Sequence, residues 1–215
     1  AYSHIAAKDL FKDAEIKTCA TFEETFKQAH EDENYKIIIP IENSLAGRVA
    51  DIHYLLPKYK LQIHGEYFLN VEHNLLCKPE ANIKDIKYVR SHAQAIGQCQ
   101  KIINKNKFQS IVSADTAGSA KDLAEGKDKS IAAIASSLSA EIYKLKILEK
   151  NVEDEKGNVT RFLIMGKNIE QPEFVNGKQF ITSCIFRVKS EPSALYKCLG
   201  GFATNQVNPV SYTHL

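Results

Sequence analysis

The stretch YKIIIPIE, residues 35–42, decides the fold class of this chain of 215 residues. Its five consecutive apolar residues are typical of a strand that is buried on both faces. The segment before it, TFEETFKQAH (21–30), predicts a helix, because Thr21 and Glu24 have the spacing of a capping box. The segment after it, NSLAGRVADIHYLL (43–56), also predicts a helix. A buried strand between two helices indicates an α/β fold.

The same alternation, which is typical of parallel α/β units, continues through the middle of the chain. Strands are expected at 87–92, 109–114 and 130–136, and helices at 93–105, 115–126 and 137–145. Extended segments at 61–78 and near 150 are long enough to cross between two such sets, so we predict two lobes with a cleft between them. A polar linker at 168–177 then separates a last strand (179–188) and helix (193–205), which suit a small α+β module that is incomplete.

Composition excludes several classes of function. The formal net charge is +2 and the lysines are spread along the chain, so we expect no nucleic-acid partner. No apolar run approaches the roughly 18 residues that a membrane span needs. The five cysteines are far apart and form no CxxC pair, which is typical of free thiols in a reducing compartment. The histidines have no HxxxH spacing, so we expect no metal site.

Short polar side chains follow four of the expected strands, where ligands bind in open α/β sheets. They are Glu42, Asn43 and Ser44; Ser91, His92, Gln94 and Gln98; Asp115, Thr116 and Ser119; and Asn158, Thr160 and Arg161. None of these places has the glycine-rich fingerprint of a nucleotide site. The pattern therefore predicts a compact anion with carboxylates and hydroxyls as the ligand, bound without a nucleotide cofactor.

Most of these residues also have an ordinary structural explanation. Ser44, Ser91 and Thr116 are equally typical of helix N-caps, each worth about 1 kcal/mol. Gln94 and Gln98 equally suit a solvated helix face. Arg161 can pair with a substrate carboxylate or form a structural ion pair within the acidic turn NVEDE (151–155). Glu42 is different, because it directly follows the apolar run, and burying a carboxylate is costly unless it is paired or functional.

Beyond these patterns, the chain resembles the prephenate dehydratase family over nearly its whole length. The motifs that carry the resemblance are AYSHIAA (1–7), IPIENSLAGRV (39–49), SHAQAIGQC (91–99), ADTAGSA (114–120), AAIAS (132–136) and GNVTRFLI (157–164). The tail TSCIFRVKSEPSALYKCLGGFATNQVN (182–208) resembles the first half of an ACT regulatory domain.

The resemblance implies a fold and a domain plan. The fold is α/β, with a two-lobed catalytic domain like a type II periplasmic binding protein and a cleft, plus an incomplete α+β ACT domain. The catalytic domain is expected at 1–168 without its first strand, since both ends of the chain look cut. Lobe one is expected at about 1–70 and 155–168, lobe two at about 71–154, and the partial ACT domain at 178–215.

The implied activity is the conversion of prephenate to phenylpyruvate, CO2 and water in phenylalanine biosynthesis, in the cytoplasm and without a cofactor. The resemblance also implies a homodimer or tetramer, with L-phenylalanine as an allosteric inhibitor at Ser193, Ala194 and Leu195. Ser193 stands where the family has glycine. Two alternatives stay open: an arogenate dehydratase, and a non-catalytic two-lobed module that only binds a ligand.

The resemblance also assigns roles in the site. Thr160 is expected to contact the leaving hydroxyl, and Glu42 to supply the proton if burial favours its protonated form. His4 and His92 are weaker candidates for that donor. The expected substrate-binding residues are Asn43, Ser44, Ser91, Gln98, Thr116, Ser119, Asn158, Arg161, Phe162, Ser3 and His4.

Overall fold

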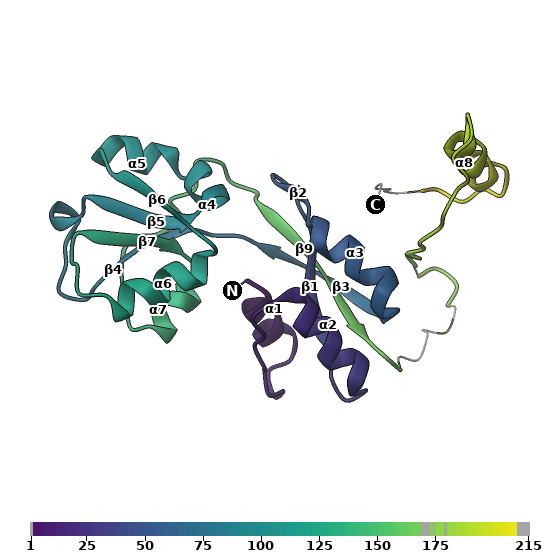
Figure 1. The fold of residues 1–215 in the computed structure, drawn as a ribbon, viewed down its shortest axis with the longest axis horizontal. Coiled ribbons are helices and arrows are strands. Elements are labelled where there is room, and N and C mark those ends of the chain that lie inside the picture. The colour runs from purple at the N-terminus through teal and green to yellow at the C-terminus, as the bar shows by residue number, and fades with distance from the viewer. Residues whose placement is uncertain (1, 169–172, 174, 179, 210–215) are drawn as a thin grey trace.

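The protein is built around two separate sheets, which lie at the centres of two lobes (Figure 1). The computed structural model describes residues 2–168, 173, 175–178 and 180–209. Lobe one contains the four-stranded sheet and lobe two the five-stranded sheet. The two-lobed α/β class predicted from the sequence is thereby confirmed.

The sheet of lobe one is antiparallel throughout, whereas the sequence predicted parallel units. Its strands lie in the order β2 (Gly47–Arg48), β1 (Ile37–Asn43), β9 (Val159–Gly166) and β3 (Gln62–Asn70). The parallel prediction was wrong here because β9 returns from lobe two and inserts between β1 and β3, antiparallel to both.

Helices cover both faces of this sheet. On one face, α2 (Phe22–Glu31) and α3 (Ala50–Tyr59) pack on β1 and β9 through a core that includes Phe26, Ile39, Ile52 and Met165. On the other, α1 (Tyr2–Leu10) contacts β1 and β3. The predicted capping box is found in part, since the Thr21 hydroxyl accepts the N–H of Glu24 at 3.1 Å. Because side chains alternate along a strand, Thr160 and Phe162 of β9 share the face opposite to Leu163 and Met165.

The helix predicted from residue 43 begins later. Residues 44–46 form a turn between β1 and β2, and α3 begins only at Ala50. The amide oxygen of Asn43 accepts the backbone N–H groups of Leu45 and Ala46, and Gly47 has a φ of 77°. That left-handed conformation suits glycine and closes a turn instead of a helix.

Lobe two has a mixed sheet in the order β6 (Gln109–Ser113), β5 (Tyr88–His92), β7 (Ile131–Ala135), β4 (Asn74–Cys77) and β8 (Lys146–Glu149). Strands β6, β5 and β7 are parallel, and β4 and β8 are antiparallel to their neighbours. The helical elements are η1 (Ile83–Asp85), α4 (Ala93–Gly97), α5 (Gln100–Asn106), α6 (Thr116–Glu125) and α7 (Ser137–Ile142).

The single helix predicted at 93–105 is broken between α4 and α5, at Gln98 and Cys99. The cause is Asp154, whose carboxylate accepts the N–H groups of Gln100 at 2.8 Å and Lys101 at 2.9 Å. The N–H of Asp154 also donates to the carbonyl of Gln98 at 2.6 Å. A residue more than fifty positions away thus caps α5 and fixes where Gln98 lies.

Two linking segments, 71–73 and 150–158, run side by side between the lobes. The N–H of Val71 donates to the carbonyl of Asn158, and the N–H of Val152 donates to the carbonyl of His73, both at 2.8 Å. Each segment therefore holds the other where the chain crosses from one sheet to the other (Figure 1).

The tail lies apart from both lobes (Figure 1). The predicted helix at 193–205 is present as α8 (Ala194–Thr204). The strand predicted at 179–188 was wrong: residues 180–188 form no strand, and residue 179 lies outside the described residues. A strand needs a neighbour to pair with, and within the described ranges none lies beside this segment. No helix among those residues combines the length and the apolar composition that crossing a bilayer requires.

Candidate active site

The polar residues predicted from two distant motifs meet where β1 ends and β9 begins. Asn43 lies opposite Thr160 in the register of the two strands. The Asn43 Nδ2 donates to Thr160 Oγ1 at 2.9 Å, to Asn158 Oδ1 at 2.6 Å and to the carbonyl of Val159 at 3.3 Å. Asn158 and Thr160 are buried, and Asn43 is half-buried.

The direction of these hydrogen bonds is fixed by the backbone. The Asn43 Oδ1 accepts the N–H groups of Leu45 at 3.1 Å and Ala46 at 2.9 Å. Because a backbone N–H can only donate, the Asn43 amide cannot turn over, and its Nδ2 must face Thr160. Thr160 Oγ1 therefore accepts, and its own hydrogen, for which the described residues provide no recorded acceptor, remains available to a ligand.

The chain of hydrogen bonds continues from lobe one to lobe two. The Asn158 Nδ2 donates to Gln98 Oε1 at 2.9 Å, and the same oxygen lies 3.0 Å from His73 Nε2. His73 Nδ1 in turn lies 2.9 Å from the hydroxyl of Tyr2. The sequence identified Asn43, Asn158, Gln98 and Thr160 but missed His73 and Tyr2. Tyr2 lies within the motif AYSHIAA (1–7), but nothing in that motif pointed to His73, whose partners lie far away along the chain.

Burial keeps three groups of this hydrogen-bonded region neutral. It lowers the pKa of His73, although the hydrogen bond that the ring makes to Gln98 and the charge of Glu153 partly oppose the shift. It raises the pKa of the Tyr2 hydroxyl, and it raises the pKa of the neighbouring Cys99 thiol to about 12. At neutral pH all three groups are therefore neutral.

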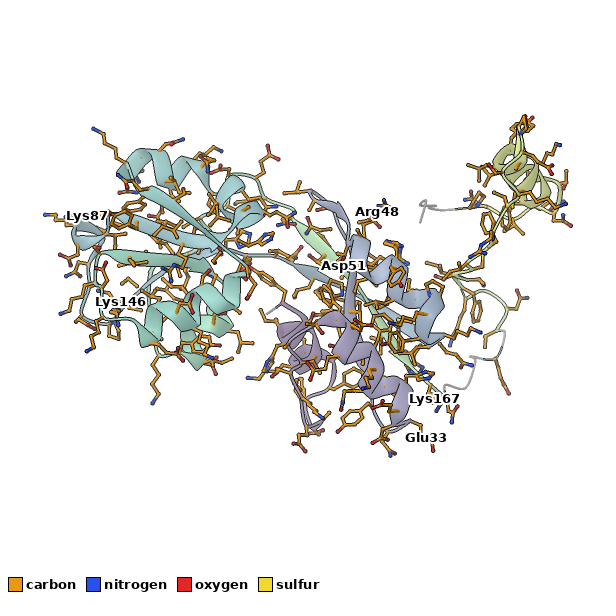
Figure 2. All side chains as sticks on the ribbon, in the orientation of Figure 1. Glu33, Arg48, Asp51, Lys87, Lys146 and Lys167 are labelled. Atoms are coloured by element: carbon orange, nitrogen blue, oxygen red, sulfur yellow. The ribbon has the colours of Figure 1, made fainter. Side chains whose placement is uncertain are left out.

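Glu42 does not have the burial that its proposed role as proton donor requires. Its side chain is exposed, and it lies opposite Arg48 of β2, which is labelled in Figure 2. The register of β1 shifts between Pro40 and Glu42, so Ile41 stays in the core while Glu42 stands on the outer face of the hairpin. The prediction of a buried carboxylate was wrong for this physical reason.

Arg161 is held by an ion pair. Its Nε and Nη2 both lie 2.7 Å from Glu66 Oε2, on the neighbouring strand β3. The alternatives considered from the sequence were a substrate carboxylate or an acidic residue of the turn before β9. The partner is instead a carboxylate contributed by the sheet.

The serines expected to bind substrate make hydrogen bonds to other groups of the protein. Ser91 is fully buried and donates to the carbonyl of Ile134 at 2.7 Å. Ser119 is also buried, donates to the carbonyl of Asp115 at 2.7 Å and contacts the Ser113 hydroxyl. Ser44 is in the turn after β1 and not at a helix end; its hydroxyl donates to the carbonyl of Gly157 at 3.2 Å and accepts the N–H of Val159 at 2.9 Å.

The N-cap explanation holds for none of the hydroxyls of Ser44, Ser91 and Thr116. The N-cap of α6 is Asp115, which accepts the N–H of Gly118 at 2.7 Å, and Thr116 is the first helical residue. The N-cap of α4 is His92, the residue after Ser91. Gln94 is exposed, as a solvated helix face requires, whereas Gln98 points between the lobes.

The remaining predicted residues lie outside the hydrogen-bonded chain. Phe162 is buried on the same face of β9 as Thr160. Ser3 and His4 of α1 line a large groove that neither Asn43 nor Thr160 lines, and burial lowers the pKa of His4. Ser193, Ala194 and Leu195 lie at the start of α8, where Ser193 has a left-handed φ of 64°.

A metal centre finds no support in this geometry. Within the part of the chain that the structure describes, no three His, Cys, Asp or Glu residues gather closely enough to hold an ion.

Comparison with known proteins identifies the family. The family model described as prephenate dehydratase matches residues 1–170. A bifunctional N-acyl-homoserine lactone acylase/prephenate dehydratase of Komagataeibacter europaeus is 40% identical over 211 residues, which cover 97% of this chain and 74% of the relative. Arogenate dehydratase/prephenate dehydratase 2 of Arabidopsis thaliana is 36% identical over 208 residues, which cover 97% of this chain but only 54% of the relative.

A solved structure agrees with these relatives. The prephenate dehydratase of Arthrobacter aurescens, in complex with L-Phe, superposes with a TM-score of 0.81 at 25% sequence identity and covers 92% of this chain and 65% of that one. The chain thus spans about half the length of its plant relative and about two thirds of this solved chain. On the family model and these likenesses, the chain belongs to the prephenate dehydratase family.

Proposed function

We propose that the chain catalyses the decarboxylating dehydration of prephenate to phenylpyruvate, CO2 and water, a step of L-phenylalanine biosynthesis. Family membership supports the reaction. The observation that carries the assignment of the site is the fixed bond from Asn43 to Thr160, which leaves the threonine hydroxyl as a hydrogen-bond donor inside a buried, uncharged region.

The chemistry asks for positioning more than for a strong nucleophile. The bond between the ring and its carboxylate breaks, its electron pair enters the ring, and the bond to the ring hydroxyl breaks as water forms. Aromatisation drives this change, so the protein has to hold the ring and stabilise the departing oxygen. In our proposal Thr160 donates its hydrogen bond to that oxygen. The proton itself comes from another source, because a threonine hydroxyl is a very weak acid.

The surroundings of Thr160 suit a substrate with two carboxylates. Gln98 uses its Oε1 within the protein, so its Nε2 hydrogens are available as donors to a ligand. Glu42 is exposed and is therefore not a buried acid, so we do not assign it as the proton donor. We retain Asn43, Asn158 and Gln98 as the groups that shape the site around Thr160.

A second candidate is the same reaction on arogenate, which carries an amino group where prephenate has a keto group. The likeness to an Arabidopsis protein whose name includes both activities favours testing it. The name of the Komagataeibacter relative adds N-acyl-homoserine lactone hydrolysis as a third activity to measure. A folded chain that binds prephenate and converts none of these compounds would support the non-catalytic module instead.

The test uses the purified chain with prephenate and with arogenate, and follows the formation of phenylpyruvate and phenylalanine. Thr160→Val keeps the shape of the side chain and removes the donor, so we expect kcat to fall by about 100- to 1000-fold. Thr25→Val, in α2, is the matched control, because within the described part of the chain the Thr25 hydroxyl bonds only the carbonyl of Thr21. A folded Thr160→Val variant with kcat within a few-fold of the parent would refute the role of Thr160.

Regulation and assembly are further parts of this proposal. We propose a catalytic domain at 1–168, a partial ACT domain at 178–215, a homodimer or tetramer, and a cytoplasmic location. The solved relative with bound L-Phe supports L-phenylalanine as an effector, for which Ser193, Ala194 and Leu195 are the candidate contacts. Inhibition of turnover by L-phenylalanine, measured alongside the oligomeric state by light scattering, tests both points.

A further inference from the structure

Both the backbone and the ring of His73 make hydrogen bonds at the crossing between the lobes. Its N–H donates to Glu153 Oε2 at 2.9 Å, and its carbonyl accepts the N–H of Val152 at 2.8 Å. Its ring is buried between Gln98 of lobe two and Tyr2 of α1. Both its backbone and its ring are therefore fixed where the chain passes from one sheet to the other.

The hydrogen-bonded chain determines which ring nitrogen carries the hydrogen. Asn43 is oriented by two backbone N–H groups, so Asn158 must accept through Oδ1 and donate through Nδ2. Gln98 must then present Oε1 to Asn158. The same oxygen faces His73 Nε2 at 3.0 Å, and a carbonyl oxygen can only accept. His73 Nε2 therefore carries a hydrogen. In the neutral ring Nδ1 is then the acceptor that faces the Tyr2 hydroxyl, whose single hydrogen is shared between Nδ1 at 2.9 Å and the carbonyl of Glu72 at 3.0 Å.

The consequence for Gln98 is a fixed orientation. Two donors from different segments, Asn158 Nδ2 and His73 Nε2, converge on its Oε1. Its Nε2 is turned away from both of them, and among the described residues no acceptor is recorded for it. If the amide turned over, its Nε2 would meet two donors, so His73 makes the wrong orientation unfavourable.

We propose that His73, supported by Tyr2, is a positioning residue for the reaction: it holds the Gln98 amide so that its hydrogens face the ligand bound at Thr160. This inference rests on the proposed function. It also accounts for the location of His73, because Gln98 belongs to lobe two while Asn158 and Thr160 belong to the segment that enters lobe one. The Nε2–H of His73, which lies at the crossing, thus sets the orientation of Gln98 relative to Asn158 and Thr160.

Two replacements separate this role from simple packing. His73→Gln keeps an N–H donor close to the position of Nε2, whereas His73→Leu keeps volume and removes the donor. We expect kcat/KM to fall about 10- to 100-fold in His73→Leu and to stay within about three-fold of the parent in His73→Gln. Asn74→Leu is the matched control, since Asn74 is the next residue and is equally buried, and among the described residues its side chain bonds only the N–H of Asn151. It is expected to lose stability while turnover persists.

A double-mutant cycle with Gln98→Leu shows whether His73 acts through Gln98. If it does, His73→Leu lowers kcat/KM by less than about two-fold in the Gln98→Leu background. The ring nitrogens of the parent give an independent signature, because 15N NMR distinguishes the two neutral tautomers, and we expect hydrogen on Nε2.

Several results would overturn the inference. They are hydrogen on Nδ1 in the neutral ring, additive effects in the cycle, or a folded His73→Leu variant with the turnover of the parent. A failure of the proposed function looks different, because the parent itself would then convert neither prephenate nor arogenate. In that case the proposed function and the positioning role of His73 are both refuted.

Discussion

Replacing Asn43 by aspartate changes a single group at the centre of the site. The Nδ2, which donates to Thr160 Oγ1, Asn158 Oδ1 and the carbonyl of Val159, becomes an oxygen. The other oxygen still accepts the N–H groups of Leu45 and Ala46, so the turn between β1 and β2 keeps its support. The change therefore reverses one set of hydrogen bonds and leaves the backbone in place.

The magnitude follows from what the neighbours can do. Thr160 turns its hydrogen toward the new carboxylate, since a hydrogen bond to a charged acceptor is stronger than one to a neutral group. The donor for the leaving oxygen is then lost, which is worth about 2.7–4 kcal/mol, or about 100- to 1000-fold in kcat. Asn158 Oδ1 loses its donor, and a buried group left unsatisfied costs about 1–3 kcal/mol of stability. The Val159 carbonyl still accepts the N–H of Ser44 at 2.8 Å. The new bond from Thr160 offsets part of that cost.

The assay measures kcat and KM for prephenate together with thermal unfolding. We expect kcat to fall far more than the loss of stability explains, and KM to rise because the new anion repels a dicarboxylate. Asn34→Asp is the matched control: Asn34 is exposed, its Nδ2 donates to Asp32 and to no other residue that the structure describes, and its replacement changes the same atoms outside the site. A folded Asn43→Asp variant with kcat within three-fold of the parent would refute the orienting role of Asn43.

Two further predictions concern the crossing between the lobes. Asp154→Ala removes the carboxylate that caps α5, so the free energy of unfolding should fall by about 1–2 kcal/mol in urea titrations. The N–H of residue 154 still donates to the carbonyl of Gln98, but the helix break that places Gln98 loses its cap, so kcat should also fall; unchanged kcat would contradict that coupling. Burial lowers the pKa of His73, which faces Tyr2 and Glu153, so its contribution to stability is complete above about pH 6.5 and decreases as the pH falls below that value. His73→Gln should flatten this part of the stability–pH curve, whereas His4 and His53, whose pKa values burial also lowers, continue to contribute in both proteins.

Local signals in the sequence predicted the elements whose ends are set by nearby residues. Helix α2 begins where Thr21 caps it, and β1 occupies the apolar run before Glu42. The break between α4 and α5 was not predictable in this way, because it is caused by Asp154, which contacts α5 but lies more than fifty residues further along the chain. The late start of α3 has a similar cause, since the side chain of Asn43 takes up the N–H groups that would have begun a helix.

The candidate site likewise combines residues that local sequence patterns identify with residues that they do not. Asn43 and Thr160 were each recognisable within a motif, but they are 117 residues apart, and only the antiparallel pairing of β1 with β9 places them in contact. Glu42 illustrates the opposite error, because the apolar run suggested burial while a shift in strand register exposes the carboxylate. His73 carries no local signal, since its importance comes only from what it contacts, and the motif that contains Tyr2 does not show that Tyr2 faces His73.

The neutrality of the site fits the proposed reaction. From Tyr2 to Thr160 the hydrogen-bonded chain is made of hydroxyls, amides and a neutral imidazole, and the nearest cation of β9, Arg161, is already paired with Glu66. A cation bound tightly to the ring carboxylate would stabilise the ground state, whose charge has to move into the ring before CO2 can leave. Neutral donors hold a carboxylate in position with a smaller penalty for that loss of charge, so more of the binding energy is retained in the transition state. Such a site has a cost, because a side-chain amide can turn over and exchange its donor for its acceptor. Two backbone N–H groups prevent this at Asn43, and His73 opposes it at Gln98.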